Sequence, residues 1–356
     1  MPLFETTPVD VEEVRKLVKA HWNAELGANV RASQNQTFKA TIGEGEASTE
    51  VFVRVTPNPG GKRTKSIEFE LKVLDFLEKK AIHVCPALPA LESGALQVPL
   101  GELSVSVFRK AKGEFVDFVE YKWMFEEERV LALGRFAAKL HLALDEFHDT
   151  HLDIMADARN WSDLHDGVLK DYALHTEDVE SAKNAASQKY VAKPSSEYVT
   201  PRAFGLIHSD LNCSNYYWQP ELKEPSVFDW DQLCTSWREY DLASCIWPVV
   251  TLESAGSPVD MSKVPDANSA AFTEILVSGY EAAIGHGYKV NREILARMLA
   301  KRRELYRVFC SRALSELEPG TFMWKFCNFM NNWLSGGKTE EDSKTEETQQ
   351  QDVQAQ

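Results

Sequence analysis

Apolar residues follow two different periods in the first third of the chain. They recur at helical spacing over residues 9–25 and 66–80, which predicts two amphipathic helices, the second with Ser66 as a cap. Residues 36–41 and 49–55 are instead rich in β-forming side chains and flank a turn-like Gly-Glu-Gly-Glu stretch. This pattern predicts a β-hairpin between the two helices.

Further along, the pattern becomes mostly helical. Residues 93–108 predict two more short strands, and from about Phe125 the apolar positions follow helical spacing. Further helices are expected in the ranges 162–171, 178–191, 270–284 and 291–317. We therefore expect an α+β fold with a small β-rich first lobe, which contains one key helix, and a larger, mainly helical second lobe.

The division of the chain follows from this change of pattern. Residues 1–108 are expected to form the β-rich lobe, and residues 109–337 the helical lobe. Residues 338–356 are rich in Glu, Thr and Gln and have too few apolar side chains to build a core, so we expect a disordered tail.

Composition narrows the class of partner. The formal net charge is −15, and the Glu-rich tail accounts for −4 of it, which leaves −11 on the rest of the chain. Such an acidic surface argues against binding nucleic acid and favours cationic small molecules, although charge for solubility alone is an equal alternative. We find no signal peptide and no apolar run near twenty residues, so we expect a cytoplasmic protein that does not contact membranes. The six cysteines form no metal-binding or disulfide pattern and are expected to be reduced core residues.

Two short polar loops carry the candidate chemistry. An apolar segment leads into His208-Ser209-Asp210, and Asn215 follows Asp210 by five positions. A second apolar segment ends at Asp229. One carboxylate and one amide oxygen suit a magnesium ion that also takes oxygen ligands from phosphates. The alternative for Asp210 and Asn215 is a structural turn or capping pair, since both residue types are common there.

These loops resemble a known family. His-Ser-Asp-Leu at 208–211 with Asn215, then Val-Phe-Asp-Trp-Asp at 227–231, then Tyr-Asp-Leu-Ala at 240–243, are similar to the motifs of aminoglycoside phosphotransferases and choline-kinase-like enzymes. Weaker similarity extends over roughly residues 30–310. The resemblance implies the bilobal protein-kinase-like fold and an ATP- and Mg²⁺-dependent phosphotransferase, a small-molecule kinase that acts on an alcohol group. The acceptor implied is amine-bearing, such as an amino alcohol, a hydroxylated amino acid, a choline-like compound or an aminoglycoside.

The resemblance also implies a role for individual residues. Asp210 would be the catalytic base, and Asn215 and Asp229 would hold the metal. Arg54 would contact the nucleotide phosphates and pair with Glu70, for which Glu68 on the other face of the helix is the alternative. The remaining implied nucleotide contacts are Asn35, in the loop over the phosphates, and the adenine-side residues Phe108, Arg109 and Lys110.

Several departures from the family pattern and several alternatives stay open at this level. Ser209 stands where the family has glycine, which is tolerable unless the position needs a positive φ. The phosphate loop around Asn35 lacks glycines, and together with Ser209 this keeps a catalytically inactive nucleotide-binding or regulatory module as the alternative function. A protein kinase is a weaker rival because there is no Asp-Phe-Gly and no Ala-Pro-Glu motif. Asp241 is expected to cap the helix that starts at Leu242. The identity of the acceptor and the oligomeric state cannot be read from the sequence.

Overall fold

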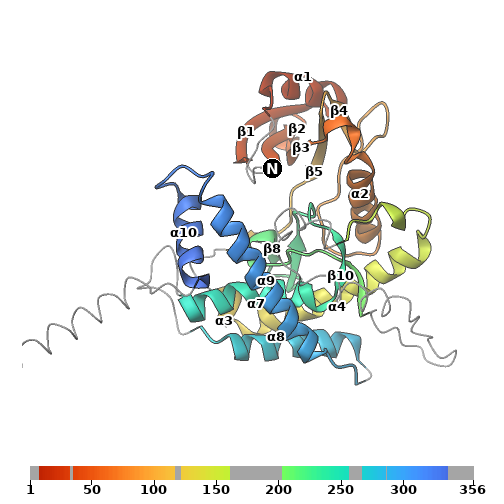
Figure 1. Cartoon of the computed structure of the whole chain (residues 1–356). Coiled ribbons are helices and arrows are strands. Elements are labelled where there is room, and N and C mark those ends of the chain that lie inside the picture. The colour runs from red at the N-terminus through yellow and green to blue at the C-terminus, as the bar shows by residue number, and fades with distance from the viewer. Residues whose placement is uncertain are drawn as a thin grey trace, which may run out of the picture.

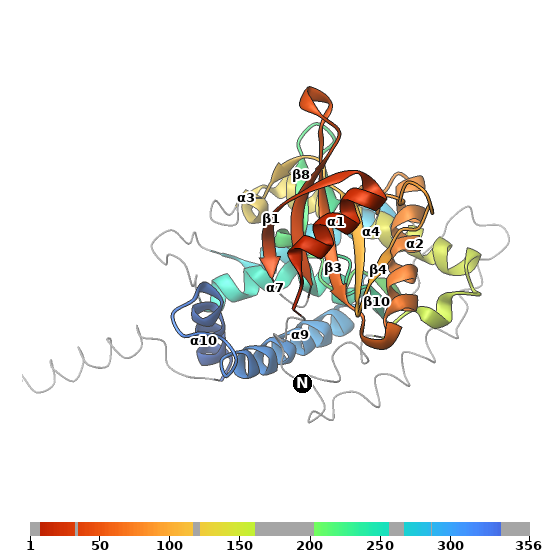
Figure 2. The ribbon, with the colours of Figure 1, turned by 90° about the horizontal axis from the view of Figure 1, so that it is seen from above.

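The computed structural model describes residues 8–32, 35–116, 122–160, 203–255, 267–285 and 287–335. Figure 1 shows a smaller lobe of N-terminal elements above a larger lobe built mainly of helices, and Figure 2 shows the same arrangement from above. The expected α+β, two-lobed fold is therefore confirmed. The elements of the first lobe are α1 Val11–Trp22, β1 Ala24–Ala32, β2 Gln36–Ile42, η1 Gly45–Ala47, β3 Thr49–Pro57, η2 Pro59–Gly61, α2 Thr64–Lys79, β4 Val98–Leu100 and β5 Leu103–Arg109.

An antiparallel sheet of five strands in the order β1-β2-β3-β5-β4 forms the first lobe. The predicted hairpin is β2 and β3, paired with Phe38 opposite Val53. Phe38, Val51, Val53 and Val55 are buried and face α1, which contributes Val14, Val18 and Trp22 to the same core. Alternation of buried and exposed side chains along β2 thus places one face of the sheet against this helix.

For the two helices of this lobe, the bounds predicted from periodicity differ from those in the structure by one to three residues. The first helix stops at Trp22, because Asn23 adopts the left-handed conformation with φ 52°, and the next nine residues form strand β1 rather than more helix. Ser66 does not cap α2, which begins at Thr64 after Arg63, and its hydroxyl instead donates to the Arg63 carbonyl.

The second lobe contains short strands that helical periodicity did not predict. A three-stranded sheet in the order β6-β8-β9 and the pair β10-β7 lie among the helices. The elements are β6 Glu114–Phe115, α3 Lys122–Phe125, α4 Glu127–Thr150, η3 Met155–Asp157, β7 Phe204–Ile207, η4 Cys213–Asn215, β8 Tyr216–Gln219, β9 Glu224–Val227, β10 Cys234–Trp237, α7 Glu239–Ala255, α8 Ser269–Ile284, α9 Arg292–Ala313 and α10 Phe322–Leu334. The helices expected at 270–284 and 291–317 are α8 and α9. Those expected at 162–171 and 178–191, and the tail at 338–356, lie outside the described residues.

Two glycines allow the central helices α4 and α8 to approach closely. A β-carbon on Gly134 would lie 2.0 Å from the Leu276 carbonyl oxygen, and one on Gly279 would lie 2.1 Å from the Leu131 carbonyl oxygen. The two backbones are therefore in direct contact, which makes this pair the rigid base of the lobe. Within the described residues, no helix is both long enough and apolar enough to span a bilayer.

Helix α2 belongs to the first lobe by sequence but packs into the core of the second. Phe69, Val73, Leu74 and Leu77 of α2 are buried in the same cluster as α4 and α7. Downstream of α2, the backbone N–H of Val227 donates to the His83 carbonyl, with an N–O distance of 2.9 Å. The start of the loop that carries Asp229 is thereby tied to the segment that follows α2.

Candidate active site

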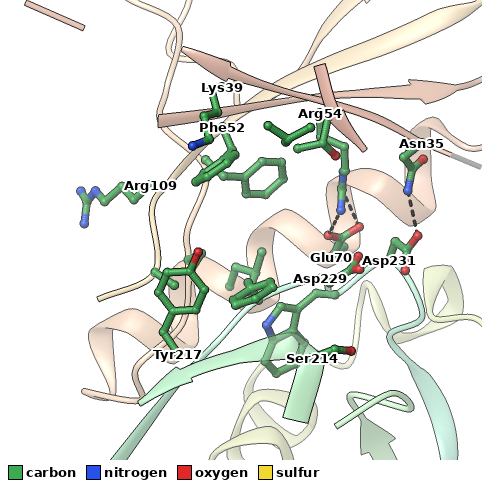
Figure 3. A pocket seen from close by; sticks show the side chains of 18 of the residues that line it. Asn35, Lys39, Phe52, Arg54, Glu70, Arg109, Ser214, Tyr217, Asp229 and Asp231 are labelled. Atoms are coloured by element: carbon green, nitrogen blue, oxygen red, sulfur yellow. Dashed lines mark hydrogen bonds and ion pairs between the residues drawn. The ribbon is translucent and has the colours of Figure 1, made fainter. Parts of the chain in front are cut away.

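A cavity of about 500 Å³ lies between the first-lobe sheet and the loop that follows β9 (Figure 3). One part of its wall is apolar and aromatic, with Phe52, Phe108 and Phe228. The other part is charged, and its lining side chains include Asn35, Arg54, Glu70, Asp229 and Asp231. A cavity of this size with an apolar region and a charged region suits a planar base attached to phosphates.

Arg54 and Glu70 form a two-pronged buried ion pair. Nη1 and Nη2 of Arg54 donate to Oε1 and Oε2 of Glu70 at 2.7 and 2.9 Å. The side chains are 10% and 5% exposed, and the Arg54 guanidinium lies 4.7 Å from the centre of the Phe108 ring. Burial alone would lower the pKa of Arg54, but the adjacent Glu70 carboxylate raises it, so the cation is firmly charged. Glu68 is exposed on the other face of α2, so Glu70 is the partner.

Asn35 contacts the second lobe across the cavity. Its amide nitrogen donates to Oδ2 of Asp231 at 2.8 Å. Burial, and next the negative charge of Asp229, raise the pKa of Asp231 to about 7. The structure thus brings two half-buried carboxylates, Asp229 and Asp231, close enough to interact, with Arg54 and Arg159 as positive neighbours.

Asp210 is held by three donors. Oδ1 accepts from the Asn212 amide at 2.9 Å and from Nη2 of Arg302 at 2.6 Å, and Oδ2 accepts from the Asn215 amide at 2.8 Å. Burial alone would raise the pKa of Asp210, but the ion pair with Arg302 outweighs it and holds the pKa below its ordinary value. Asp210 is therefore an ionised carboxylate, with 24% of its side chain exposed to solvent.

The backbone of the Asp210 loop is hydrogen-bonded to a buried aspartate, Asp241. Oδ2 and Oδ1 of Asp241 accept from the backbone N–H groups of His208 and Ser209 at 2.9 and 2.7 Å. Asp241 lies inside the first turn of α7, so the expectation that it caps a helix starting at Leu242 was wrong. Its carboxylate serves a segment 32 to 33 residues earlier instead.

A neutral histidine completes this support. Nε2 of His141 lies 3.2 Å from Oδ2 of Asp241, and Nδ1 lies 2.8 Å from the hydroxyl of Tyr280. Burial lowers the pKa of His141, so the ring is neutral and donates from Nε2 to Asp241. Burial opposes the ionised form of Asp241, yet the hydrogen bond from His141 holds its pKa below the ordinary value.

Ser209 and Asp229 both adopt left-handed backbone conformations, with φ values of 73° and 64°. The position of Ser209 is therefore one that favours glycine. Ser209 is fully buried, and its Oγ has no hydrogen-bond partner within the described part of the chain. Backbone strain of this kind persists where the surrounding structure determines the geometry, as it does at functional sites.

The three residues expected on the adenine side lie at the end of β5, but in different environments. Phe108 and Arg109 line the cavity. The Arg109 side chain pairs with Glu78, and its backbone N–H donates to the Pro86 carbonyl at 3.1 Å. The Lys110 ammonium lies 3.3 Å from a carboxylate oxygen of Glu50.

Sequence reasoning missed Arg302, Tyr217 and Cys85. Tyr217 and Cys85 line the cavity, and Arg302 contacts Asp210 from α9. For Arg302 there was a usable signal, because it follows Leu295 and Met298 on the buried side of α9. A charged residue at such a position needs a buried partner.

The donor set fits a magnesium ion shared with a phosphate chain. The Asn215 amide nitrogen donates to Asp210, so the amide oxygen is the atom that could bind a metal. Asp229 supplies a carboxylate at the cavity wall. In the described ranges, no group of three His, Cys, Asp or Glu side chains forms a complete metal cage. A metal held by Asn215 and Asp229 would therefore complete its shell with substrate oxygens and water, as magnesium does.

Comparison with solved structures agrees with the two-lobed fold. An amicoumacin kinase in complex with AMP-PNP, Ca²⁺ and Ami is 16% identical, with a TM-score of 0.63 over 92% of this chain and 94% of that one. A spectinomycin phosphotransferase in complex with ADP and spectinomycin is 13% identical, with a TM-score of 0.57 over 92% and 95%. A microcompartment-associated aminopropanol kinase is 18% identical, with a TM-score of 0.55 over 91% and 95%. At these identities the likeness shows the fold.

Membership rests on the sequence itself. No match was found among curated proteins. The model of the phosphotransferase enzyme family, in contrast, matches residues 30–262, a range that contains Arg54, Asp210 and Asp229. The chain therefore belongs to the phosphotransferase enzyme family.

Proposed function

We propose that this enzyme transfers the γ-phosphoryl group of ATP, with Mg²⁺, to a hydroxyl group of a small amine-bearing molecule. The observation that carries the proposal is the link from Asp210 to a cavity that contains the Arg54–Glu70 ion pair. Asp210 is hydrogen-bonded to Asn215, whose backbone carbonyl accepts from the backbone N–H of Phe228, and the next residue, Asp229, lines the cavity. Charge neutralisation, a metal site and a base are the three parts that phosphoryl transfer requires.

The nucleotide is assigned to the cavity in one orientation. Its base would lie between Phe52 and Phe108 from the first lobe and Phe228 from the second, and its phosphates would extend towards Arg54 and Asn35. Bound nucleotides in the amicoumacin and spectinomycin kinase structures support a nucleotide role for this cavity. Magnesium, when bound by Asn215 and Asp229, would neutralise charge on the phosphate oxygens.

Asp210 performs the proton transfer in this proposal. Its ionised carboxylate accepts a hydrogen bond from the acceptor hydroxyl and orients the oxygen in line with the γ-phosphorus. As the acceptor oxygen forms its bond to phosphorus, the bond from phosphorus to the β,γ-bridging oxygen breaks, ADP leaves, and the hydroxyl proton moves to Asp210. Solvent then takes this proton, because the side chain is 24% exposed.

An amine-bearing acceptor is the substrate class that the remaining observations favour. The formal net charge of −15 attracts cations to the surface. One structural neighbour is an aminopropanol kinase, whose named substrate is an amino alcohol. Amino alcohols, hydroxylated amino acids, choline-like compounds and aminoglycosides are thus the first acceptors to test.

The test is ADP release from ATP and Mg²⁺ across these four classes, with neutral sugars as the comparison. Asp210→Asn should abolish turnover while leaving AMP-PNP affinity within about threefold, because it removes the base and keeps the shape. Asp75→Asn is the matched control, since Asp75 is half exposed on α2 and pairs with Lys79. Full activity in Asp210→Asn would refute the assignment of the base.

The metal role needs a separate measurement. Asp229→Ala should weaken AMP-PNP binding in calorimetry when Mg²⁺ is present and change it little when Mg²⁺ is absent. An equal loss with and without the metal would count against Asp229 as a ligand.

A catalytically inactive nucleotide-binding module is the second candidate function. The buried, left-handed Ser209 is the observation that favours it, because strain beside Asp210 could displace the base. This candidate predicts AMP-PNP binding without ADP release for every acceptor. The three donors that hold Asp210 argue for the active enzyme.

A further inference from the structure

Arg302 is a buried cation on the otherwise apolar side of α9. It is 2% exposed, and the same side of the helix buries Leu295 and Met298. Its guanidinium lies 5.8 Å from the ring centre of Tyr240 and 5.4 Å from that of Tyr306. Removing such a charge from water is unfavourable unless it is paired, so the contacts of its nitrogens explain its presence.

The Arg302 nitrogens contact the Asp210 loop and Ser244 of α7. Nη2 donates to Oδ1 of Asp210 at 2.6 Å. Nη1 donates to Oγ of Ser244 at 2.8 Å and lies 3.3 Å from the Ser209 carbonyl oxygen. Because a guanidinium is planar and rigid, these bonds fix the Asp210 carboxylate relative to its own backbone.

The hydrogen bonds to Asp210 distinguish its two oxygens. A carboxylate has about four lone-pair positions. Arg302 and Asn212 both donate to Oδ1, whereas Asn215 alone donates to Oδ2. Oδ1 is therefore saturated, and Oδ2 retains one position for a further donor.

We propose that Arg302 is a positioning residue for phosphoryl transfer, which holds Asp210 so that Oδ2 receives the proton of the acceptor hydroxyl. This inference rests on the proposed function. In the transfer, the O–H bond of the acceptor breaks, a new O–H bond forms on Oδ2, and the acceptor oxygen bonds to the γ-phosphorus as the bond to ADP breaks. Arg302 keeps its proton throughout and exchanges nothing with the substrate.

The kinetic test compares Arg302→Met and Arg302→Lys with the wild type. Without the two guanidinium nitrogens of Arg302, the Asp210 carboxylate can rotate. Misplacement of a reacting group can lower the rate about 100-fold. We expect Arg302→Met to lower kcat by about that factor with the KM for ATP within twofold, because Arg302 does not line the nucleotide cavity. Arg302→Lys should restore part of kcat, since an ammonium group can replace one of these contacts but cannot make both in the planar geometry of a guanidinium.

Arg303→Met is the matched control. Arg303 is the next residue of α9, is exposed, and lies over Trp333 at 5.5 Å. Its kinetics should equal those of the wild type. A folded Arg302→Met with kcat within threefold of wild type, or with a loss found entirely in the KM for ATP, would overturn the positioning role.

A thermal-unfolding cycle tests the pair if Arg302→Met is unstable. The melting temperatures of Arg302→Met, Asp210→Asn and the double variant should be non-additive, because each single change leaves one member of the pair behind. Additive shifts would refute the coupling. A wild-type protein that transfers no phosphoryl group to any acceptor would instead refute the proposed function. Failure of the proposed function is thus distinguishable from failure of the positioning role of Arg302.

Discussion

Ser209→Gly should stabilise the enzyme, because Ser209 combines backbone strain with an unpaired buried hydroxyl. A left-handed conformation costs an L-residue about 1–2 kcal/mol. Glycine removes that strain but adds about 0.5–1 kcal/mol of backbone entropy to the unfolded chain. Removing a buried hydroxyl that has no partner in the described structure contributes about 1 kcal/mol more.

The net gain is about 1–2.5 kcal/mol, which for a chain of 356 residues corresponds to a rise in melting temperature of roughly 1–3 °C. Thermal unfolding of Ser209→Ala and Ser209→Gly separates the two contributions, since alanine removes only the hydroxyl. The hydrogen bond from the backbone N–H of residue 209 to Asp241 persists in both variants, so the loop should keep its position. A melting temperature for Ser209→Gly at or below that of wild type would refute the reasoning.

Two further predictions concern stability. Burial raises the pKa of Glu239 to about 7 from 4.5, so between these pH values the native state keeps a proton that the unfolded state releases, and stability falls as pH rises. Glu239→Gln removes this loss, which is worth about 3 kcal/mol above pH 7. Its melting temperature should therefore exceed that of wild type at pH 8 but match it at about pH 4, below the unfolded pKa; equal differences at both pH values would contradict the assignment. Gly134→Ala should lower the free energy of unfolding in urea by about 3 kcal/mol, because the new methyl group would overlap the Leu276 carbonyl oxygen. Without that overlap, the higher helix propensity of alanine would raise stability by about 1 kcal/mol. A rise in the free energy of unfolding would therefore contradict the close contact of the two helices.

The sequence predicted the parts of the site that are local in the chain. Asp210 and Asn215 are five positions apart, and the structure joins them by a hydrogen bond of 2.8 Å. The Arg54–Glu70 pair followed from strand and helix periodicity together with the family motif. Whether these residues bind nucleotide and metal stays a prediction.

What the sequence did not predict depends on contacts between distant segments. Arg302 is 92 residues from Asp210, and helical spacing does not state which neighbour a helix faces. Asp241 resembled a helix cap because its local context is a helix start, but its carboxylate binds backbone groups of another segment. Strand β1 was missed because its sequence, Ala-Glu-Leu-Gly-Ala-Asn-Val-Arg-Ala, contains few β-branched residues and its pairing is interrupted by register shifts.

Anchoring of α2 in the second lobe has a consequence for regulation. Moving this helix away from β3 would separate Glu70 from Arg54 and expose Phe69, Val73 and Leu74, at roughly 1.5–3 kcal/mol for each side chain. Together with the buried ion pair, this opposes an inactive state in which the helix swings outward. The Arg54–Glu70 pair is therefore expected to be in place before any substrate binds, and control by an outward swing of this helix is disfavoured.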